Sequence, residues 1–147
     1  MKYVRALAVG AILVTGVAYA QDAEPTDPNA IARSELMKLV GQNTGVLGGM
    51  ANGKEPFDAA KAEAAKAALI EAAGKIEATF AEQGAADPVS EAKPEIWTNW
   101  EDFLVKAKAF GDAAAAVDVA SAETIGAGMG PIGGSCKDCH TTYRVQK

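Results

Sequence analysis

Apolar residues recur at steps of three and four in four stretches of this chain, which is the spacing of one face of an α-helix. The stretches predict helices over about residues 29–50, 58–82 and 94–117, and a fourth that begins near residue 121. The residues in these stripes are Leu36, Val40, Asn43, Leu47, Met50, Leu69, Ala73, Ile76, Phe80, Ile96, Trp100, Phe103, Ala107, Phe110, Ala114, Val117, Ile125, Met129, Ile132, Cys136, Cys139 and Tyr143. No stretch alternates apolar and polar residues as a strand does, so the pattern predicts an all-α protein.

Turn-forming residues separate the four predicted helices. Residues 52–56 read Asn-Gly-Lys-Glu-Pro, and residues 84–93 form a looser connection before Pro94, which suits the first position of a helix. In the fourth stretch, Pro131 and its neighbouring glycines predict a kink or a late start of the helix. Four amphipathic helices with short connections predict a single domain, an antiparallel up-down four-helix bundle.

The chain begins with the features of a secretory signal peptide. Lys2 and Arg5 are followed by an uncharged, mostly apolar run over residues 6–20, which ends in an Ala-Tyr-Ala cleavage pattern. This run is shorter than the ~20 residues that a membrane-spanning helix needs, which disfavours the alternative of a membrane anchor. We therefore expect cleavage of residues 1–20, a mature domain at residues 21–147, and no membrane span after cleavage.

The charge of the chain restricts its partners. The whole sequence carries 14 basic and 19 acidic residues, a formal net charge of −5. Loss of Lys2 and Arg5 with the signal peptide removes two positive charges and makes it −7. Such a balance disfavours nucleic acid and anionic membrane surfaces as partners. It suits a basic partner protein, and it serves solubility equally well.

The strongest chemical signal is Cys136-Lys137-Asp138-Cys139-His140, close to the C-terminus. Two thiols three residues apart point the same way on a helical turn, so they can form thioethers to two vinyl groups on one porphyrin edge, and the adjacent imidazole can bind the iron. We therefore expect one covalent haem c, anchored by Cys136 and Cys139 and ligated by His140. Haem c is attached outside the cytoplasm in bacteria, so the motif agrees with export to the periplasm.

Two cysteines at this spacing also occur in disulfides, in thiol-redox pairs and in halves of zinc sites. A zinc site lacks ligands here, because these are the only cysteines and His140 is the only histidine. A thioredoxin-like pair belongs at a strand-to-helix junction, and no strand is predicted. A haem-free bundle with a Cys136–Cys139 disulfide is the remaining alternative, and it would show no Soret absorption.

The second axial position of the iron cannot be filled by histidine, so a methionine is the candidate ligand. Met129 lies on the same predicted helix as His140, about 16 Å away, and Met50 lies at the far end of the first helix. In an up-down bundle the first and last helices are antiparallel neighbours, which brings Met37 to the haem. We expect Met37 at the distal face, as an iron ligand or as an unbonded lid.

Arg33, Gly41 and Thr44 share one side of the first helix with Met37. That side would place a guanidinium, a thioether and a bare backbone against the ring. Three glycines are spaced by four along this helix: Gly41, Gly45 and Gly49. Since each costs about 1 kcal/mol in a helix interior, they predict the close approach of a flat ring or of another helix.

These features together resemble the class II cytochromes c, over nearly all of the mature chain. The most specific segment is CKDCHTTYR at 136–144. The family has a high-spin branch, cytochrome c′, whose five-coordinate iron admits NO or CO, and a low-spin branch, in which a methionine of the first helix is the sixth ligand. The segments LMK at 36–38, VLGGMANGKEPFD at 46–58 and MGPIGGSCKDCH at 129–140 are more similar to the low-spin branch.

The resemblance implies a periplasmic electron carrier with a low-spin haem ligated by His140 and Met37, which exchanges electrons with redox partner proteins. The alternative is a high-spin cytochrome c′ that binds NO or CO, with Met37 as an unbonded lid. A catalytic haem enzyme is disfavoured, because no histidine remains to act as a distal acid–base group. Many members of the family are dimers through their first two helices, and the glycine face that includes Gly41 is the candidate contact for a homodimer here.

The remaining candidate haem contacts follow from position and chemistry. Arg33 suits a propionate, because its fork of donors matches a carboxylate. Arg144, one turn after the histidine, would place a positive charge near the imidazole and raise the reduction potential, unless it is a solvated surface residue. Trp97, Trp100 and Tyr143 are candidates for contact with the ring, and core packing explains them equally well.

Overall fold

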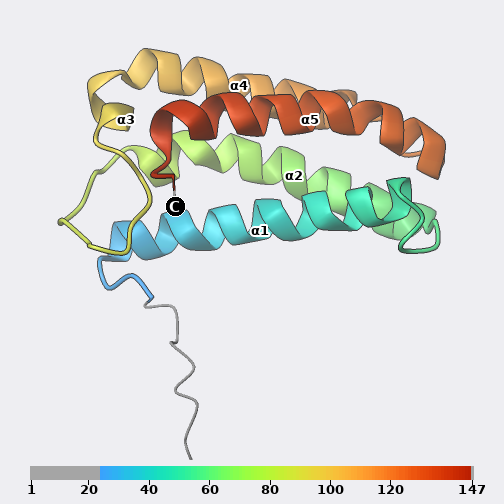
Figure 1. Ribbon diagram of the computed structural model, residues 1–147, viewed down its shortest axis with the longest axis horizontal. Coiled ribbons are helices and arrows are strands. Elements are labelled where there is room, and N and C mark those ends of the chain that lie inside the picture. The colour runs from blue at the N-terminus through green and yellow to red at the C-terminus, as the bar shows by residue number, and fades with distance from the viewer. Residues whose placement is uncertain (1–23, 147) are drawn as a thin grey trace, which may run out of the picture.

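The computed structural model describes residues 24–146, and the expected signal peptide at residues 1–20 lies outside them. The described chain forms five helices: α1 (Pro28–Ala51), α2 (Ala59–Phe80), α3 (Glu95–Thr98), α4 (Trp100–Ala116) and α5 (Ala122–Tyr143) (Figure 1). The one β pairing among the described residues is an isolated bridge between Ala92 and Arg144. The predicted all-α fold is confirmed.

The four long helices form an antiparallel up-down bundle (Figure 1). α1 packs against α2 and α5, and α4 packs against the same two helices, so α1 and α4 lie on a diagonal. The predicted stripes supply the core, in which the largest fully buried side chains are Leu47, Leu69, Ile96, Val117, Ile125 and Ile132. Seven stripe residues of the predicted helices are only half-buried: Asn43, Ala73, Trp100, Ala107, Met129, Cys136 and Cys139.

Side chains placed just before three of the helices fix where they begin. The Asp27 carboxylate accepts hydrogen bonds from the first free N–H groups of α1, those of Asn29 and Ala30, both at 3.0 Å. Asp58 caps α2 through the Lys61 N–H at 3.1 Å. At α5 the cap is reciprocal, because Ser121 accepts from the Thr124 N–H and the Thr124 side chain accepts from the Ser121 N–H.

The structure corrects the prediction of one unbroken helix over residues 94–117. Asn99 has φ −122° and ψ 43°, outside the helical region, and separates α3 from α4. Its N–H donates to the Glu95 carbonyl at 2.9 Å and its carbonyl accepts from the Phe103 N–H at 3.0 Å, so it ends one helix and begins the next. The apolar pattern runs across this break because Ile96 and Phe103, on either side of it, are both buried.

Of the kink or late start predicted near Pro131, the late start is wrong, since α5 runs from Ala122 through Pro131 to Tyr143, and the kink stays a prediction. Pro131 is exposed, while Ile125 and Ile132 are fully buried. Burial of this stripe, together with the cap at the start of α5, stabilises the helix against the cost of a proline and several glycines in its interior. Tertiary packing therefore overrides local helix propensity here.

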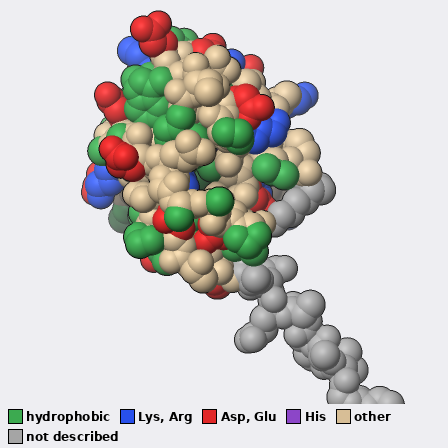
Figure 2. Space-filling view, turned by 90° about the vertical axis from the view of Figure 1, so that its left-hand side faces the viewer, with side chains coloured by type: hydrophobic (Ala, Val, Ile, Leu, Met, Phe, Trp, Pro, Cys, Tyr) green, Lys and Arg blue, Asp and Glu red, His purple; other side chains and the backbone are tan. Residues whose placement is uncertain are grey.

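The connection between α2 and α3 is tied to the start of α1. The Asp87 carboxylate accepts hydrogen bonds from the N–H groups of Thr26 and Asp27, at 2.7 Å and 3.0 Å, and Asp27 accepts one from the Ala85 N–H at 3.0 Å. Gly84 has φ +76°, and a Cβ there would collide with the Asp27 carboxylate, so the contact requires glycine. At this end of the molecule, acidic and basic side chains lie among apolar ones (Figure 2).

Asp87→Asn should lower the melting temperature at pH 7, and the melting temperature of the variant should fall less steeply as the pH is lowered. The N–H groups of Asp27, Thr26 and Val89 lower the pKa of Asp87 to about 2. A carboxyl whose folded pKa is depressed stabilises the fold above its ordinary pKa, and this contribution is lost as the pH falls from about 4 to about 2. Thermal unfolding followed by circular dichroism at pH 7 and at acid pH tests this.

Glu101→Gln is the matched control, because Glu101 is an exposed carboxylate on α4. Equal losses of melting temperature at pH 7 in the two variants would show that the Asp87 hydrogen bonds do not stabilise the bundle.

Candidate functional site

Cys136, Cys139 and His140 lie together in the last two turns of α5. Both cysteines are half-buried free thiols that pack against the hydrophobic core, and the imidazole is half-buried as well. Burial raises the pKa of the Cys136 thiol, and it raises that of Cys139 to about 11. Burial also lowers the pKa of His140, assisted by the positive charge of Arg144. The site therefore favours neutral thiols beside a neutral imidazole, the form of histidine that binds metals.

This environment disfavours the other uses of a paired-cysteine motif. A reactive thiol-redox pair has a lowered pKa, as at a helix N-terminus, whereas Cys136 and Cys139 lie near the C-terminus of α5 and have raised pKa values. Within residues 24–146 no group of three or more His, Cys, Asp or Glu side chains could hold a metal ion. A zinc site is therefore not built around these cysteines in the described part of the chain.

Two close contacts define how α1 and α5 lie against each other. A Cβ added to Gly48 would lie 3.7 Å from Met129 Cε, and one added to Gly126 would lie 3.9 Å from the Ala51 Cβ. Both contacts give the same antiparallel register. Gly48 lies three residues before Ala51 on α1, and Met129 lies three residues after Gly126 on α5, as expected for two helices that run in opposite directions. Because every helical residue rises by the same amount, this register extends along both helices.

The register places Met37 at the level of His140. Met37 lies eleven residues before Gly48, and His140 lies eleven residues after Met129. Met37 is half-buried and packs against the hydrophobic core. A thioether on α1 and an imidazole on α5 thus occupy the same level of two neighbouring antiparallel helices.

The remaining expected residues of α1 are consistent with a group held between the two helices. Gly41 falls at the level of Cys136 in the same register, and it is exposed, with nothing within 4 Å of a Cβ added there. The Thr44 hydroxyl is buried without a hydrogen-bond partner. Two thiols, an imidazole, a thioether and an uncrowded glycine fit the demands of a covalently attached haem.

Arg33 has other partners than the propionate carboxylate expected from the sequence. Its side chain is 5% exposed, and its two terminal nitrogens donate to the carbonyls of Glu82 and Gln83 at 2.9 Å and 3.1 Å. The guanidinium lies over the rings of Trp97 and Phe80, 5.2 Å and 5.8 Å from their centroids. Arg33 therefore fastens the segment just after α2 to α1, and its Nε is buried without a hydrogen-bond partner.

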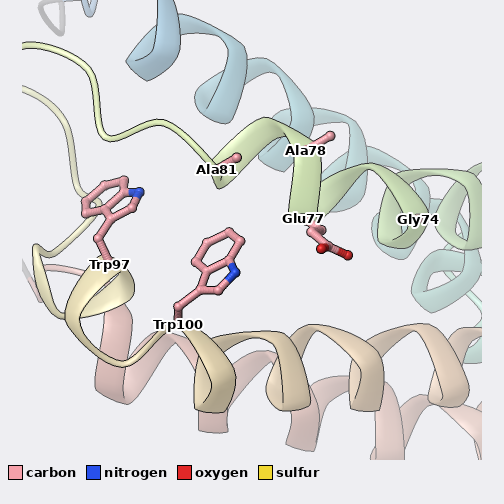
Figure 3. Close-up of a pocket in the computed structure, with 6 residues that line it drawn as sticks. All are labelled: Gly74, Glu77, Ala78, Ala81, Trp97 and Trp100. Atoms are coloured by element: carbon pink, nitrogen blue, oxygen red, sulfur yellow. The ribbon is translucent and has the colours of Figure 1, made fainter.

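The three aromatic candidates lie among other side chains at this end of the bundle. The Trp97 indole N–H donates to the Phe80 carbonyl at 2.8 Å, while the Trp100 ring stacks on Phe103 with centroids 5.4 Å apart. Both tryptophans line a groove of about 560 Å³ between α2 and the start of α4 (Figure 3). Tyr143 is buried, and its hydroxyl donates to the Asp102 carboxylate at 2.5 Å.

No pattern along the chain indicates the partner of Arg144. Its guanidinium pairs with the Glu91 carboxylate through Nε and Nη2, both at 2.5 Å. The two residues are 53 positions apart, and Glu91 lies in a connection without periodic structure, so no spacing rule links them. Only the path of the connection over the end of α5 brings the pair together.

Comparison with known proteins identifies the family of this chain. The family model described as Cytochrome C′ matches residues 29–144. Cytochrome c-556 of Agrobacterium tumefaciens (strain apple 185) is 37% identical over 119 residues, which cover 79% of this chain and 94% of the relative.

Solved structures of the same family share the fold. Cytochrome c′ from Rhodobacter Spheriodes superposes with a TM-score of 0.74 at 31% identity, over 81% of this chain and 96% of that one. A nitric oxide complex of a cytochrome c prime mutant from Alcaligenes xylosoxidans gives a TM-score of 0.70 at 27% identity, over 80% and 94% of the two chains. The chain belongs to the cytochrome c′ family of class II cytochromes c, and its cofactor is covalently bound haem c with iron.

Proposed function

We propose that this protein is a bacterial periplasmic electron carrier, with Cys136 and Cys139 bonded to haem c and with His140 and Met37 as axial ligands. The observation that carries the proposal is the shared level of Met37 and His140 on two neighbouring antiparallel helices. The half-burial of both side chains supports it, because each lies on the bundle side of its helix rather than free in solvent.

Haem c supplies an iron that alternates between Fe(III) and Fe(II), and the chain determines how readily this exchange occurs. Burial keeps His140 neutral, so its ring nitrogen is available to the metal. A Met37 thioether on the opposite side leaves no open position for a substrate. Both ligands belong to long helices packed in one bundle, which limits rearrangement between the two oxidation states.

The proposal includes export and a non-catalytic role. Residues 1–20 act as the cleaved signal peptide, and residues 21–147 form the mature domain. Among the described residues, no helix is long and apolar enough to cross a membrane. With His140 used as a ligand, no other histidine is present for acid–base catalysis, so redox partner proteins are the reactants. A homodimer through α1 and α2 is part of the proposal, since exposed Ile31, Leu39 and Ile70 lie on these helices.

A second candidate function rests on one of the structural neighbours. That neighbour is a nitric oxide complex of a cytochrome c prime. In this alternative Met37 covers the distal face without bonding the iron, and a small gas displaces it. The two functions differ in whether the thioether is an iron ligand.

Absorption spectra of the purified ferric and ferrous protein, with CO added afterwards, distinguish the two functions. Met37 ligation predicts sharp ferrous α and β bands, a sulfur-to-iron charge-transfer band in the ferric form, and no response to CO. A broad high-spin spectrum that shifts at once with CO would assign the protein to the gas-binding alternative.

Met37→Leu should convert the spectrum to high spin, open the iron to CO and lower the reduction potential. Leucine nearly preserves the side-chain volume and removes the sulfur, so the effect reports ligation rather than packing. Met50→Leu is the control, because Met50 is a buried methionine at the far end of α1 and makes neither of the two contacts that set the register. Retention of a low-spin spectrum by Met37→Leu would exclude Met37 as the ligand.

Intact mass spectrometry of the protein from a periplasmic extract should give the mass of residues 21–147 plus one haem. The haem should resist acid–acetone extraction, since thioether bonds hold it. Replacing Cys136 and Cys139 together with serine should abolish this acid-stable attachment while leaving the N-terminus at Gln21. A mass that still includes residues 1–20 would contradict cleavage, and a haem-free native protein would contradict the cofactor assignment.

A further inference from the structure

A bridge between two distant segments lies beside the end of α5. The Arg144 guanidinium pairs with Glu91 through two nitrogens, Nε and Nη2, which both lie 2.5 Å from the same carboxylate oxygen, Oε2. The side chains are partly shielded, with exposed fractions of 49% for Arg144 and 28% for Glu91. The pair lies one helical turn beyond His140.

Backbone hydrogen bonds hold both partners in place independently of the ion pair. The Lys93 N–H donates to the Tyr143 carbonyl at 3.0 Å, and the Val145 N–H donates to the Glu91 carbonyl at 2.8 Å. The Arg144 N–H donates to the His140 carbonyl at 3.1 Å, which ends α5. These hydrogen bonds hold the backbone of Glu91 beside Arg144, the residue that directly follows α5.

The two charges act in opposite directions on a metal centre held by His140. A positive charge disfavours the extra positive charge of Fe(III) and raises the reduction potential, whereas a negative charge lowers it. Both charges lie close to the ligand, since the Arg144 N–H donates to the His140 carbonyl at 3.1 Å and Glu91 pairs with the Arg144 guanidinium. The net field at the ligand thus depends on how firmly the carboxylate stays on the guanidinium.

We propose that Glu91 is a positioning residue that holds the Arg144 guanidinium at the end of α5 and offsets its charge, which lowers the reduction potential of the haem. This inference rests on the proposed ligation of the haem by His140, and it is independent of whether Met37 bonds the iron. The connection between α2 and α3, which contains Glu91, thus helps to set the reduction potential, in addition to holding the start of α1 and the end of α5.

Spectroelectrochemical titration of the purified haem protein tests this. Glu91→Gln retains an acceptor for the guanidinium and removes the negative charge, so it should raise the potential. Arg144→Gln should lower the potential, and the double variant should lie between the two single variants. Arg144→Lys keeps the positive charge, so its reduction potential should lie closer to that of the unmodified protein than the potential of Arg144→Gln does.

Glu63→Gln is the matched control, with the same change of charge at an exposed position near the start of α2, far from the end of the bundle that holds His140. The difference in reduction potential between Glu91→Gln and this control should become smaller at high salt, because salt screens partly exposed charges. Equal shifts in Glu91→Gln and Glu63→Gln, or shifts of the same sign in Glu91→Gln and Arg144→Gln, would overturn the proposal.

The outcomes separate this inference from the proposed function. If Glu91→Gln does not fold, Arg144→Gln and Arg144→Lys alone decide whether the charge at this position sets the potential. Unshifted potentials in variants with normal haem spectra would overturn the inference and leave the electron-transfer function intact. A native protein without covalent haem would overturn both.

Discussion

The antiparallel packing of α1 against α5 is the constraint on which the rest of the site depends. Contacts at the far end of this pair, between Gly48 and Met129 and between Ala51 and Gly126, set a register that both helices keep along their length. Met37 then falls at the level of His140, and Gly41 at the level of Cys136. A shift of one residue in the far contacts would rotate and displace every residue at the haem end of the bundle.

The connection between α2 and α3 complements this register at the end of the bundle that holds the haem. Asp87 fastens it to the start of α1, Arg33 fastens the segment just after α2 to α1, and the bridge of Ala92 with Arg144 fastens it to the end of α5. Two helix ends, the start of α1 and the end of α5, are therefore held by hydrogen bonds from one irregular segment. This explains how Arg33 can be buried away from solvent, since its donors satisfy carbonyls of the irregular segment that follows α2.

Much of the architecture could be predicted from the sequence, because the bundle depends on simple periodic burial. Leu36, Leu69, Phe103 and Ile132, one from each predicted stripe, are all buried in the core. The break at Asn99 was missed because apolar spacing is preserved across it, and the late start at Pro131 was wrongly expected because packing outweighs propensity. The partners of Arg33 and Arg144 were also missed, since carbonyls and a distant carboxylate leave no pattern along the chain.

The sequence by itself determined the family, the helical bundle and the cofactor, because these follow from local spacing: three- and four-residue steps in the stripes and Cys136-Lys137-Asp138-Cys139-His140 on one turn. Only the tertiary structure decided which residues of other segments lie beside that turn. The level of Met37 depends on contacts eleven residues away on two helices, and the charge beside Arg144 depends on the path of an irregular connection. Such relations arise from packing in three dimensions, and no local pattern encodes them.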